Sequence, residues 1–576
     1  MKDQPHTAAE AADLITDWFT DDDLSDEEED HQEDENLPSV VDAARQRQNR
    51  RLLSSSSDSS ESSESSDLDS DISNPSVGST ASGASTHLGK DKTIWKNSPT
   101  SIIGRTPAHN IFTGACGVPR QVSQSISTPY DAWKLFIPEI ILRSIVKYTT
   151  EEAYRKGDTN FSLTLSELEA FIALQYGRGL YGKNHPVWFL YNKEYGISVF
   201  PKTMPRDRFL KILKYLRFDD KPNRQRTGPR ADRFAPIREV FETFSSMCQT
   251  KYNCKFSLSI DEQLMPVKSR CPFITFMPNK PDKYGIKFWV LADVETKYVA
   301  NIIPYLGAQE REERGGTPLA ESVMLKLTDK IKGKGYNITC DNFFTSLPVA
   351  EKLARNKISI VGTIRKNRRE LSSQMTQPLP DKIYHSRFMW HDRSNALFVN
   401  YQPKRKKSVC LLSTMHSSPD VDTGSRQQKP NVILFYNKNK VGVDCFDQMT
   451  RLYTTRSASR RWPLSVWGNI LDIAAINAKI LFVKCTGNPI SRRQFIFQLM
   501  KNLRNEPEST STGTSTSTVA VPAAYPDRKR RKCHGKSCNN ATTCLCLSCT
   551  KPTCGTCSVS GSKVTFVKCK NCSSRV

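Results

Sequence analysis

The architecture of this 576-residue chain follows from two stretches, Phe256-Ser-Leu-Ser-Ile-Asp261 and Tyr336-Asn-Ile-Thr-Cys-Asp341. Each is rich in β-branched or aromatic residues and ends at an aspartate, which predicts a strand followed by an acid. Asp444 opens a predicted helix and has Asp447 three positions later, so both carboxylates share one helix face. Such oxygen ligands suit Mg²⁺ or Mn²⁺, and two ions about 3.5 to 4 Å apart can clamp a phosphodiester in reaction. We therefore interpret Asp261, Asp341 and Asp444 as one two-metal site, although each aspartate alone could be a helix cap or turn former.

The elements around these aspartates predict a catalytic core over residues 256–365 that resumes at 431–452. Strands are expected near 256–260, 286–291, 298–304, 336–340 and 358–364, and helices near 319–331 and 348–355. The predicted order is three strands, a helix, a strand that is followed by Asp341, and then a further helix and strand. This is the order of an RNase H-like fold. That fold would bring Asp261 and Asp341 to neighbouring central strands.

Residues 366–430 interrupt the alternation and are interpreted as a β insertion domain. Strands are expected near 388–390, 396–401 and 408–413, with basic clusters at 366–369 and 404–407. Val432-Ile-Leu-Phe-Tyr436 then returns the chain to the core. The helix that carries Asp444 and Asp447 follows, with an apolar stripe formed by Val443, Phe446, Met449 and Leu452.

A helical domain is predicted in two parts, residues 125–255 and 453–504. Thr164-Leu-Ser-Glu167 has the form of a capping box, Pro205 opens an amphipathic stretch, and 235–252 supplies another helix. In the second part a long apolar helix begins at Pro463. Its best apolar run is interrupted by charged and amide residues, so we expect no membrane-spanning helix.

Charge is divided unevenly along the chain, whose formal net charge is +23. Residues 1–71 hold 22 acidic and 5 basic residues, whereas the remaining 505 residues hold 78 basic and 38 acidic residues. A body this basic predicts binding to a polyanion, most simply nucleic acid. Residues 1–95 are an acidic, Ser-rich tail expected to be disordered and open to an acid-directed kinase. The tail either competes with DNA for the basic body or is an inert solubilising segment, and it lacks the features of a secretion signal.

The last 45 residues hold nine of the 17 cysteines, whereas the other eight are scattered singly. This favours metal ligation in a reducing compartment over the alternative of disulfides. The spacing gives four ligand pairs for two structural Zn²⁺ ions over 533–572, and the short gap between the middle pairs favours a cross-brace. Cys544 and His534 leave the ligand set at the first pair open. The ligand pairs are Cys533 with Cys538, Cys546 with Cys549, Cys554 with Cys557, and Cys569 with Cys572.

Residues 505–532 are interpreted as a Ser/Thr-rich linker that ends in the basic run Arg528-Lys-Arg-Arg-Lys532. The run is a nuclear localisation signal, a DNA-binding arm or both, and we expect a nuclear protein.

Five motifs in this order resemble the piggyBac family of cut-and-paste DNA transposases, over residues 125–572. The resemblance implies an α+β multidomain protein with an RNase H-like catalytic core, a β insertion, a split helical dimerisation and DNA-binding domain, and a C-terminal cross-brace zinc module. The motifs are Asp261-Glu-Gln-Leu-Met-Pro-Val-Lys-Ser-Arg270, Pro278-Asn-Lys-Pro-Asp-Lys-Tyr-Gly-Ile-Lys-Phe-Trp289, Asp341-Asn-Phe-Phe-Thr-Ser346, Gly442-Val-Asp-Cys-Phe-Asp-Gln-Met449 and Arg460-Arg-Trp-Pro463.

The family's catalytic aspartates correspond to Asp261, Asp341 and Asp444, and its accessory acid to Asp447. The implied reaction is cleavage at a transposon end, excision through a DNA hairpin, and joining to a TTAA target by a dimer or larger assembly. The C-terminal module departs from the family's in a wider first pair, Cys for His in the third pair and the extra Cys544.

Trp462 and five basic residues near these motifs are candidate DNA contacts. Trp462 corresponds to a tryptophan near the family's active site. Trp462 beside Arg460 and Arg461 suits stacking on an unpaired base with phosphate contact, and packing at the start of a helix is the alternative. A solvated charge run is the alternative for the lysines. The lysines are Lys280, Lys283 and Lys287.

Three functions are compatible with these features. The leading hypothesis is an active metal-dependent transposase, and the main alternative is a domesticated DNA-binding protein that retains the fold without transposing. A structure-specific nuclease without strand transfer is disfavoured by the Trp462 region and the cysteine array, which suit recognition of DNA ends.

Overall fold

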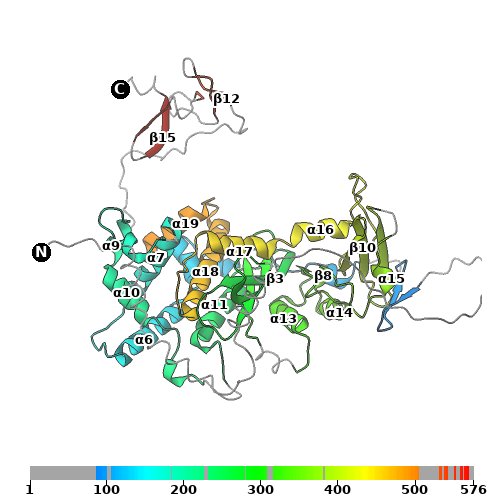
Figure 1. Cartoon of the computed structure of the whole chain (residues 1–576), viewed down its shortest axis with the longest axis horizontal. Helices are drawn as coiled ribbons and strands as arrows, with labels where there is room; N and C mark the ends of the chain where they lie inside the picture. Colours follow the sequence, from blue (N-terminus) through cyan, green and yellow to red (C-terminus); the bar gives the residue numbers. More distant parts are fainter. Residues whose placement is uncertain are drawn as a thin grey trace, which may run out of the picture. The chain divides into compact units, whose positions relative to one another are not determined.

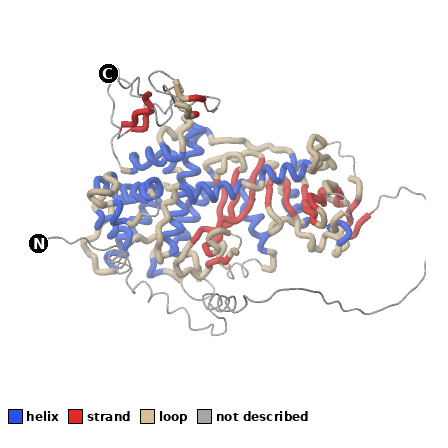
Figure 2. The backbone as a smooth tube through the Cα atoms, turned by 45° about the horizontal axis from the view of Figure 1, so that its top comes forward, coloured by secondary structure: helices blue, strands red, loops and turns tan. Residues whose placement is uncertain are grey.

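The computed structural model describes residues 86–99, 106–182, 185–225, 231–278, 280–307, 315–379, 383–504, 531–534, 538–542, 551–552, 558–561 and 564–569. The chain divides into two compact units, residues 1–506 and 507–576. The first unit combines a mixed sheet with helices, which confirms the predicted α+β class (Figures 1 and 2).

A single eleven-stranded sheet runs through the first unit in the order β1-β2-β9-β10-β11-β8-β7-β3-β5-β4, with β6 also paired to β5. β3 is parallel to β7, which is parallel to β8, and the other pairings in this sheet are antiparallel. The strands are β1 Thr86–Leu88, β2 Ile94–Lys96, β3 Ser257–Pro266, β4 Ile274–Phe276, β5 Tyr284–Asp293, β6 Val299–Pro304, β7 Asn337–Cys340, β8 Ser359–Thr363, β9 Ser386–His391, β10 Leu397–Lys404 and β11 Lys407–Ser413.

The strands expected in the predicted insertion are present as β9, β10 and β11, and they continue the central sheet instead of forming a sheet of their own. Leu411, Leu412 and Ser413 of β11 pair with β8, so the core strands and the strands of residues 366–430 share one hydrogen-bonded layer. The buried, β-branched run of β8 has an antiparallel partner on one side and parallel β7 on the other, which leaves no free edge at the predicted boundary.

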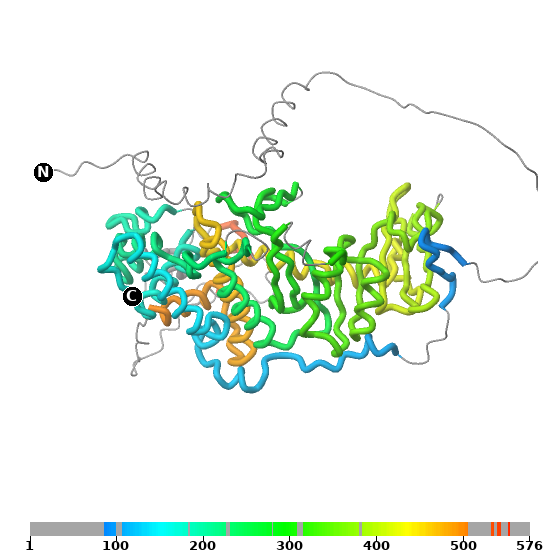
Figure 3. The backbone as a smooth tube through the Cα atoms, turned by 90° about the horizontal axis from the view of Figure 1, so that it is seen from below, coloured from blue at the N-terminus to red at the C-terminus, as the bar shows by residue number. Residues whose placement is uncertain are grey.

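The end of the predicted disordered tail is ordered in the structure. β1 and β2 form a hairpin, and β2 pairs with β9 at the far end of the sheet (Figure 3). Trp95 is fully buried there, and its indole Nε1–H donates to the carbonyl of Glu370 at 2.8 Å. One large aromatic ring thus anchors the end of a segment that was predicted to be disordered from its acidic, Ser-rich composition.

Helices cover both faces of the catalytic part of the sheet. Figure 1 shows α16 (Asn431–Asn439) and α17 (Gly442–Leu452) along one side, and α13 (Leu319–Thr328) and α14 (Leu347–Arg355) along the other. The short helices η4 (Asp329–Ile331) and α15 (Ser373–Thr376) complete this region.

The short helix η1 (Ala108–Asn110) contacts the segment after β11, where His109 and Asn110 bond to the carbonyl of Thr414. The remaining helices of the first unit form the two-part helical region. Residues 120–250 supply the first part and residues 462–503 the second. They are α4 Arg120–Ser123, α5 Pro129–Lys134, α6 Glu139–Arg155, α7 Leu165–Tyr181, α8 Val187–Leu190, α9 Val199–Thr203, α10 Arg206–Tyr215, η2 Lys221–Asn223, η3 Ala235–Ile237, α11 Arg238–Thr250, α18 Trp462–Thr486 and α19 Arg492–Leu503.

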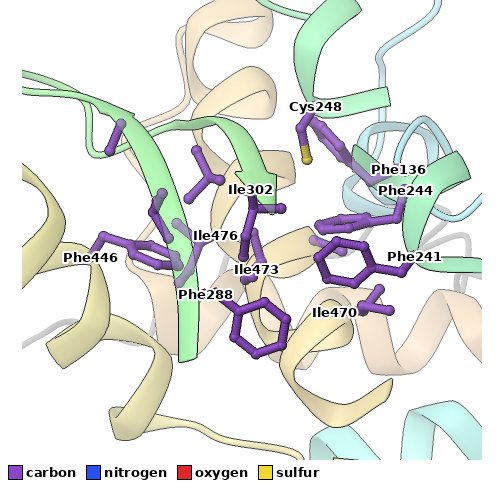
Figure 4. Packing of buried hydrophobic residues seen from close by; sticks show 14 of the residues in the cluster. Phe136, Phe241, Phe244, Cys248, Phe288, Ile302, Phe446, Ile470, Ile473 and Ile476 are labelled. Atoms are coloured by element: carbon purple, nitrogen blue, oxygen red, sulfur yellow. The ribbon is translucent and has the colours of Figure 1, made fainter. Parts of the chain in front are cut away.

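α18 joins the sheet to the helical region through the core. Ile470, Ile473 and Ile476 of α18 lie with Phe288 of β5 and Phe241 of α11 in one packed cluster (Figure 4). α18 is long and apolar enough to cross a membrane, but 83% of its most apolar window is buried inside the protein. Apolar character all round a helix is what central burial requires, so α18 is a core helix.

Two local predictions differ from the structure. β3 does not end at Asp261 but continues to Pro266, because Gln263 to Met265 are buried. Leu452 is exposed at the end of α17 and does not extend the buried stripe of Val443 and Phe446. Residues 432–436 return the chain to the core in helix α16, where Val432 and Ile433 are buried against the sheet.

The second unit contains two small antiparallel hairpins within its described residues. β12 (Arg531–Lys532) pairs with β13 (Ala541–Thr542), and β14 (Ser558–Gly561) pairs with β15 (Val564–Cys569). Cys533 directly follows β12, and Cys538 lies in the connection to β13.

Candidate active site

The sheet register places two of the predicted aspartates level with each other. Ile260 of β3 pairs in parallel with Cys340 of β7, so Asp261 and Asp341 are the next residues on neighbouring strands. Asp341 ends its strand at a turn, where its Oδ1 accepts from the Phe343 N–H at 3.0 Å. Asp261 lies inside β3, and its Oδ1 accepts from the Glu262 N–H at 2.8 Å.

The carboxyls of Asp261 and Asp341 are held in a shielded, acidic environment. Burial, followed by the neighbouring Glu262 carboxyl, raises the pKa of Asp261 well above its usual range. Burial also raises the pKa of Asp341, and Glu262 adds to the increase while the Phe343 N–H opposes it. Neighbouring acids that raise each other's pKa values form a site in which a cation is favourable.

Lys287 supplies positive charge to this group from β5. Its Nζ lies 3.8 Å from the centre of the Trp289 ring. Burial lowers the pKa of Lys287, and the charges of Glu262, Asp261 and Asp341 oppose that decrease. The predicted DNA contact Lys287 is therefore close enough for its charge to interact with the predicted catalytic acids.

Glu262 is a member of the site that the sequence predictions did not include. Lys280 Nζ lies 3.8 Å from Glu262 Oε1 and 4.0 Å from Asp444 Oδ1. Lys280 thereby lies between β3 and α17, the helix that carries Asp444. The signal that could have identified Glu262 is its position directly after Asp261, although alternation along a strand argues for opposite faces.

Asp444 is the least enclosed of the predicted metal ligands, with 60% of its side chain exposed. In the described part of the chain, no three or more His, Cys, Asp or Glu side chains lie together closely enough to hold a metal ion. The donor chemistry of Asp261 and Asp341 suits a hard divalent cation. Asp444 is related to this pair through Lys280, which also approaches Glu262.

Asp447 lies in a different network from the other predicted catalytic acids. Gln263 Nε2 donates to Asp447 Oδ1 at 3.2 Å, and Arg451 Nε donates to Asp447 Oδ2 at 3.2 Å. Gln263 also exchanges hydrogen bonds with Asn469 of α18, at 3.4 and 3.0 Å. Asp447 thus helps to connect β3, α17 and α18.

The other predicted DNA contacts differ in how far they are exposed in the structure. Trp462 is buried, with its ring stacked on Phe234 and edge-on to Phe273, as in the packing alternative. Arg461 donates to the carbonyls of Leu213, Lys214 and Leu216 near the end of α10. Arg460 and Lys283 are exposed.

The predicted zinc ligands fall largely outside the described residues. Cys533 is buried, and Cys538 is half-buried. Cys569 ends β15, and its side chain is not described. Outside the described residues lie Cys544, Cys546, Cys549, Cys554, Cys557 and Cys572.

Comparison with known proteins identifies the family. The sequence model of the family described as Transposase IS4 matches residues 128–479, more than half of the chain. Among curated proteins, the human piggyBac transposable element-derived protein 3 is 26% identical over 403 residues, covering 66% of this chain and 66% of that protein. The human chimeric ERCC6-PGBD3 protein shows the same identity over 403 residues, covering 66% of this chain and 37% of its own length.

A solved structure also matches. The cryo-EM structure of the piggyBac transposase synaptic complex with hairpin DNA has 28% sequence identity and a TM-score of 0.64, covering 80% of this chain and 100% of that chain. These matches confirm the resemblance carried by the five motifs. The chain belongs to the Transposase IS4 family, in its piggyBac-type branch.

Proposed function

We propose that this protein is a metal-dependent, cut-and-paste DNA transposase. The observation that carries the proposal is the level placement of Asp261 and Asp341 on neighbouring parallel strands, where burial and the nearby Glu262 carboxyl raise the pKa values of both. The strand order β6-β5-β3-β7-β8, with the first three antiparallel and the last two parallel to β3, supports an RNase H-like core.

Asp261, Asp341 and Asp444 would hold Mg²⁺ or Mn²⁺ in the working enzyme. Bound divalent ions supply charge stabilisation and an activated oxygen nucleophile for displacement at phosphorus. The chain's own contribution is to fix two carboxylates on rigid strands and a third on α17. Asp444 would have to leave Lys280 to join the other two.

The DNA substrate is proposed from the family and from charge. The matching cryo-EM structure is of a complex with hairpin DNA, and this chain's basic body suits a polyanion. We propose that a dimer or larger assembly of this nuclear protein binds transposon ends, excises them through DNA hairpins and joins them at TTAA. Cys533 to Cys572 would form a two-zinc module for end recognition.

A domesticated DNA-binding protein is the second candidate. Its support is the human relative, whose name describes it as transposable element-derived. The two candidates differ in genomic context, because a mobile element places this coding sequence between inverted repeats flanked by TTAA. Inverted repeats at both sides favour the transposase, and a solitary coding sequence favours domestication.

Excision in cells tests the proposed activity. A plasmid carrying the repeats that flank the coding sequence is supplied with the unaltered chain, Asp261→Asn, Asp341→Asn or Asp444→Asn. We expect excision with the unaltered chain and none with the three variants, while DNA binding remains. Substantial excision by any one variant would remove that aspartate from the proposed site.

A further inference from the structure

We propose that the exposed ring pair Phe276–Tyr284 is the surface on which an unpaired DNA base next to the cleavage site stacks. This inference rests on the proposed function, because it assigns a base-binding position on the hairpin whose turn reaches Glu262 and Asp444 through Lys280. The two residues face each other at the ends of β4 and β5. Their ring centres are 4.8 Å apart, and Phe276 and Tyr284 are 48% and 38% exposed.

The turn between the two residues of this pair contacts α17 at two points. Lys280 approaches Asp444 of α17 and Glu262 of β3, at 4.0 and 3.8 Å. Asp282 accepts from Arg451 at the other end of α17. Arg451 also contacts Asp447, at 3.1 Å. The turn that carries the ring pair therefore contacts α17 near both of its ends.

The backbone brings this hairpin close to the catalytic strand. Gly285, directly after Tyr284, pairs with Pro266 of β3. A Cβ on Gly285 would lie 2.2 Å from the carbonyl oxygen of Met265, so only glycine permits this approach. The hairpin therefore remains against the strand that carries Asp261 and Glu262.

The chemistry of this surface suits single-stranded DNA. Aromatic faces stack with bases irrespective of sequence, and neighbouring lysines contact phosphates. Lys283 is exposed in the same turn. By contrast, Trp462 is covered by Phe234 and Phe273 and offers no open face to a base in this structure.

Fluorescence and affinity measurements test the proposal with the full-length chain. The probe is a DNA duplex closed at one end by a TTAA loop that contains 2-aminopurine, measured without divalent metal so that the DNA stays intact. The comparison is a fully paired duplex of the same stem. We expect the unaltered chain to quench 2-aminopurine. The double variant Phe276→Leu with Tyr284→Leu should lose the quenching and about tenfold in affinity for the looped DNA, with unchanged affinity for the paired duplex.

Matched variants separate stacking from folding. Tyr195→Leu removes an exposed tyrosine near α9 and should behave like the unaltered chain. Phe276→Tyr with Tyr284→Trp keeps two rings and should retain the quenching. Quenching and affinity that persist in the double leucine variant would overturn the stacking site alone. Failure of the unaltered chain to bind either DNA would overturn the proposed function, and the stacking site with it.

Discussion

At the scale of single residues, the candidate site is an acidic group with lysines nearby. Burial and neighbouring carboxyls raise the pKa values of Asp261 and Asp341. Lys280 lies 3.8 Å from Glu262, and the charge of Lys287 on β5 interacts with all three acids. If these carboxyls hold a divalent cation, as we propose, its binding would offset the cost of ionising them in the folded chain.

Neutralising one buried acid should stabilise the chain without metal. The folded Asp261 carboxyl holds its proton more tightly than the unfolded one, so this residue favours folding at low pH. The free energy of unfolding loses that contribution as pH rises from about 3.9, the pKa of Asp261 in the unfolded chain, past its raised pKa in the folded chain. Thermal unfolding should thus give a higher Tm for Asp261→Asn than for the unaltered chain at pH 7, and equal Tm values near pH 3.

Metal should reverse this order. With Mn²⁺ at about a hundred times its Kd, the unaltered chain should gain about 2.7 kcal/mol, whereas Asp261→Asn should gain much less. Asp207→Asn, which alters an exposed acid on α10, serves as the control. An equal Mn²⁺ effect on all three proteins would show that the ion binds elsewhere.

At the scale of elements, α17 is positioned by polar contacts in the core. Gln263 is fully buried on β3, two residues beyond Asp261, and it contacts Asp447 and Thr450 of α17 and Asn469 of α18. A buried amide that joins three elements fixes their relative positions more specifically than apolar packing does.

A double-mutant cycle measures this connection. Gln263→Leu should cost about 1 to 3 kcal/mol, because it leaves the Asn469 amide without its partner. Asn469→Leu in the same background should cost less than Asn469→Leu alone, with a coupling of about 0.5 to 3 kcal/mol by denaturant unfolding. Additive losses would mean that the two amides do not act together.

The N-terminal hairpin should depend on one tryptophan. Trp95→Ala removes a fully buried ring and its hydrogen bond to the Glu370 carbonyl, at a cost of about 3 to 5 kcal/mol if the hairpin unfolds with the sheet. Hydrogen exchange should show loss of protection in residues 94–96 and in their partner β9. The exposed Leu88→Ala should leave protection unchanged, and an equal effect of both substitutions would contradict this anchoring role.

The sequence predicted the elements near the acids well because local patterns specify them. The Thr164 cap, the strand before Asp341 and the helix at Pro463 depend on neighbours in sequence. It missed the hairpin at Trp95, whose partners lie hundreds of residues away. It left Trp462 open between base stacking and packing, and the packing partners Phe234 and Phe273 come from distant parts of the chain. Long-range pairings of this kind are not encoded in periodicity or capping.

At the scale of the whole molecule, the sheet and the helical region share one core through α18. Substitutions in α18 should therefore affect both the catalytic strands and the helices of residues 120–250. The C-terminal unit is separate, and its cysteine pairs point to metal as its source of stability.

Removal of zinc should unfold the C-terminal unit and leave the first unit folded. A strong zinc chelator should unfold residues 533–572, seen as new protease cleavage there, while the Tm of the first unit stays constant. Mass spectrometry of the untreated protein should find two Zn²⁺ ions per chain. A chelator-resistant unit with intact disulfides would contradict the zinc assignment.

DNA strand cleavage, measured together with DNA binding, tests the central claim most directly. The unaltered chain and Asp341→Asn are mixed with DNA carrying the element's end, with Mn²⁺ present, and bound and cleaved DNA are quantified in the same samples. We predict equal binding, with cleavage by the unaltered chain alone. Cleavage by Asp341→Asn at a rate near that of the unaltered chain would contradict the assignment of the acids on β3 and β7 as the catalytic site.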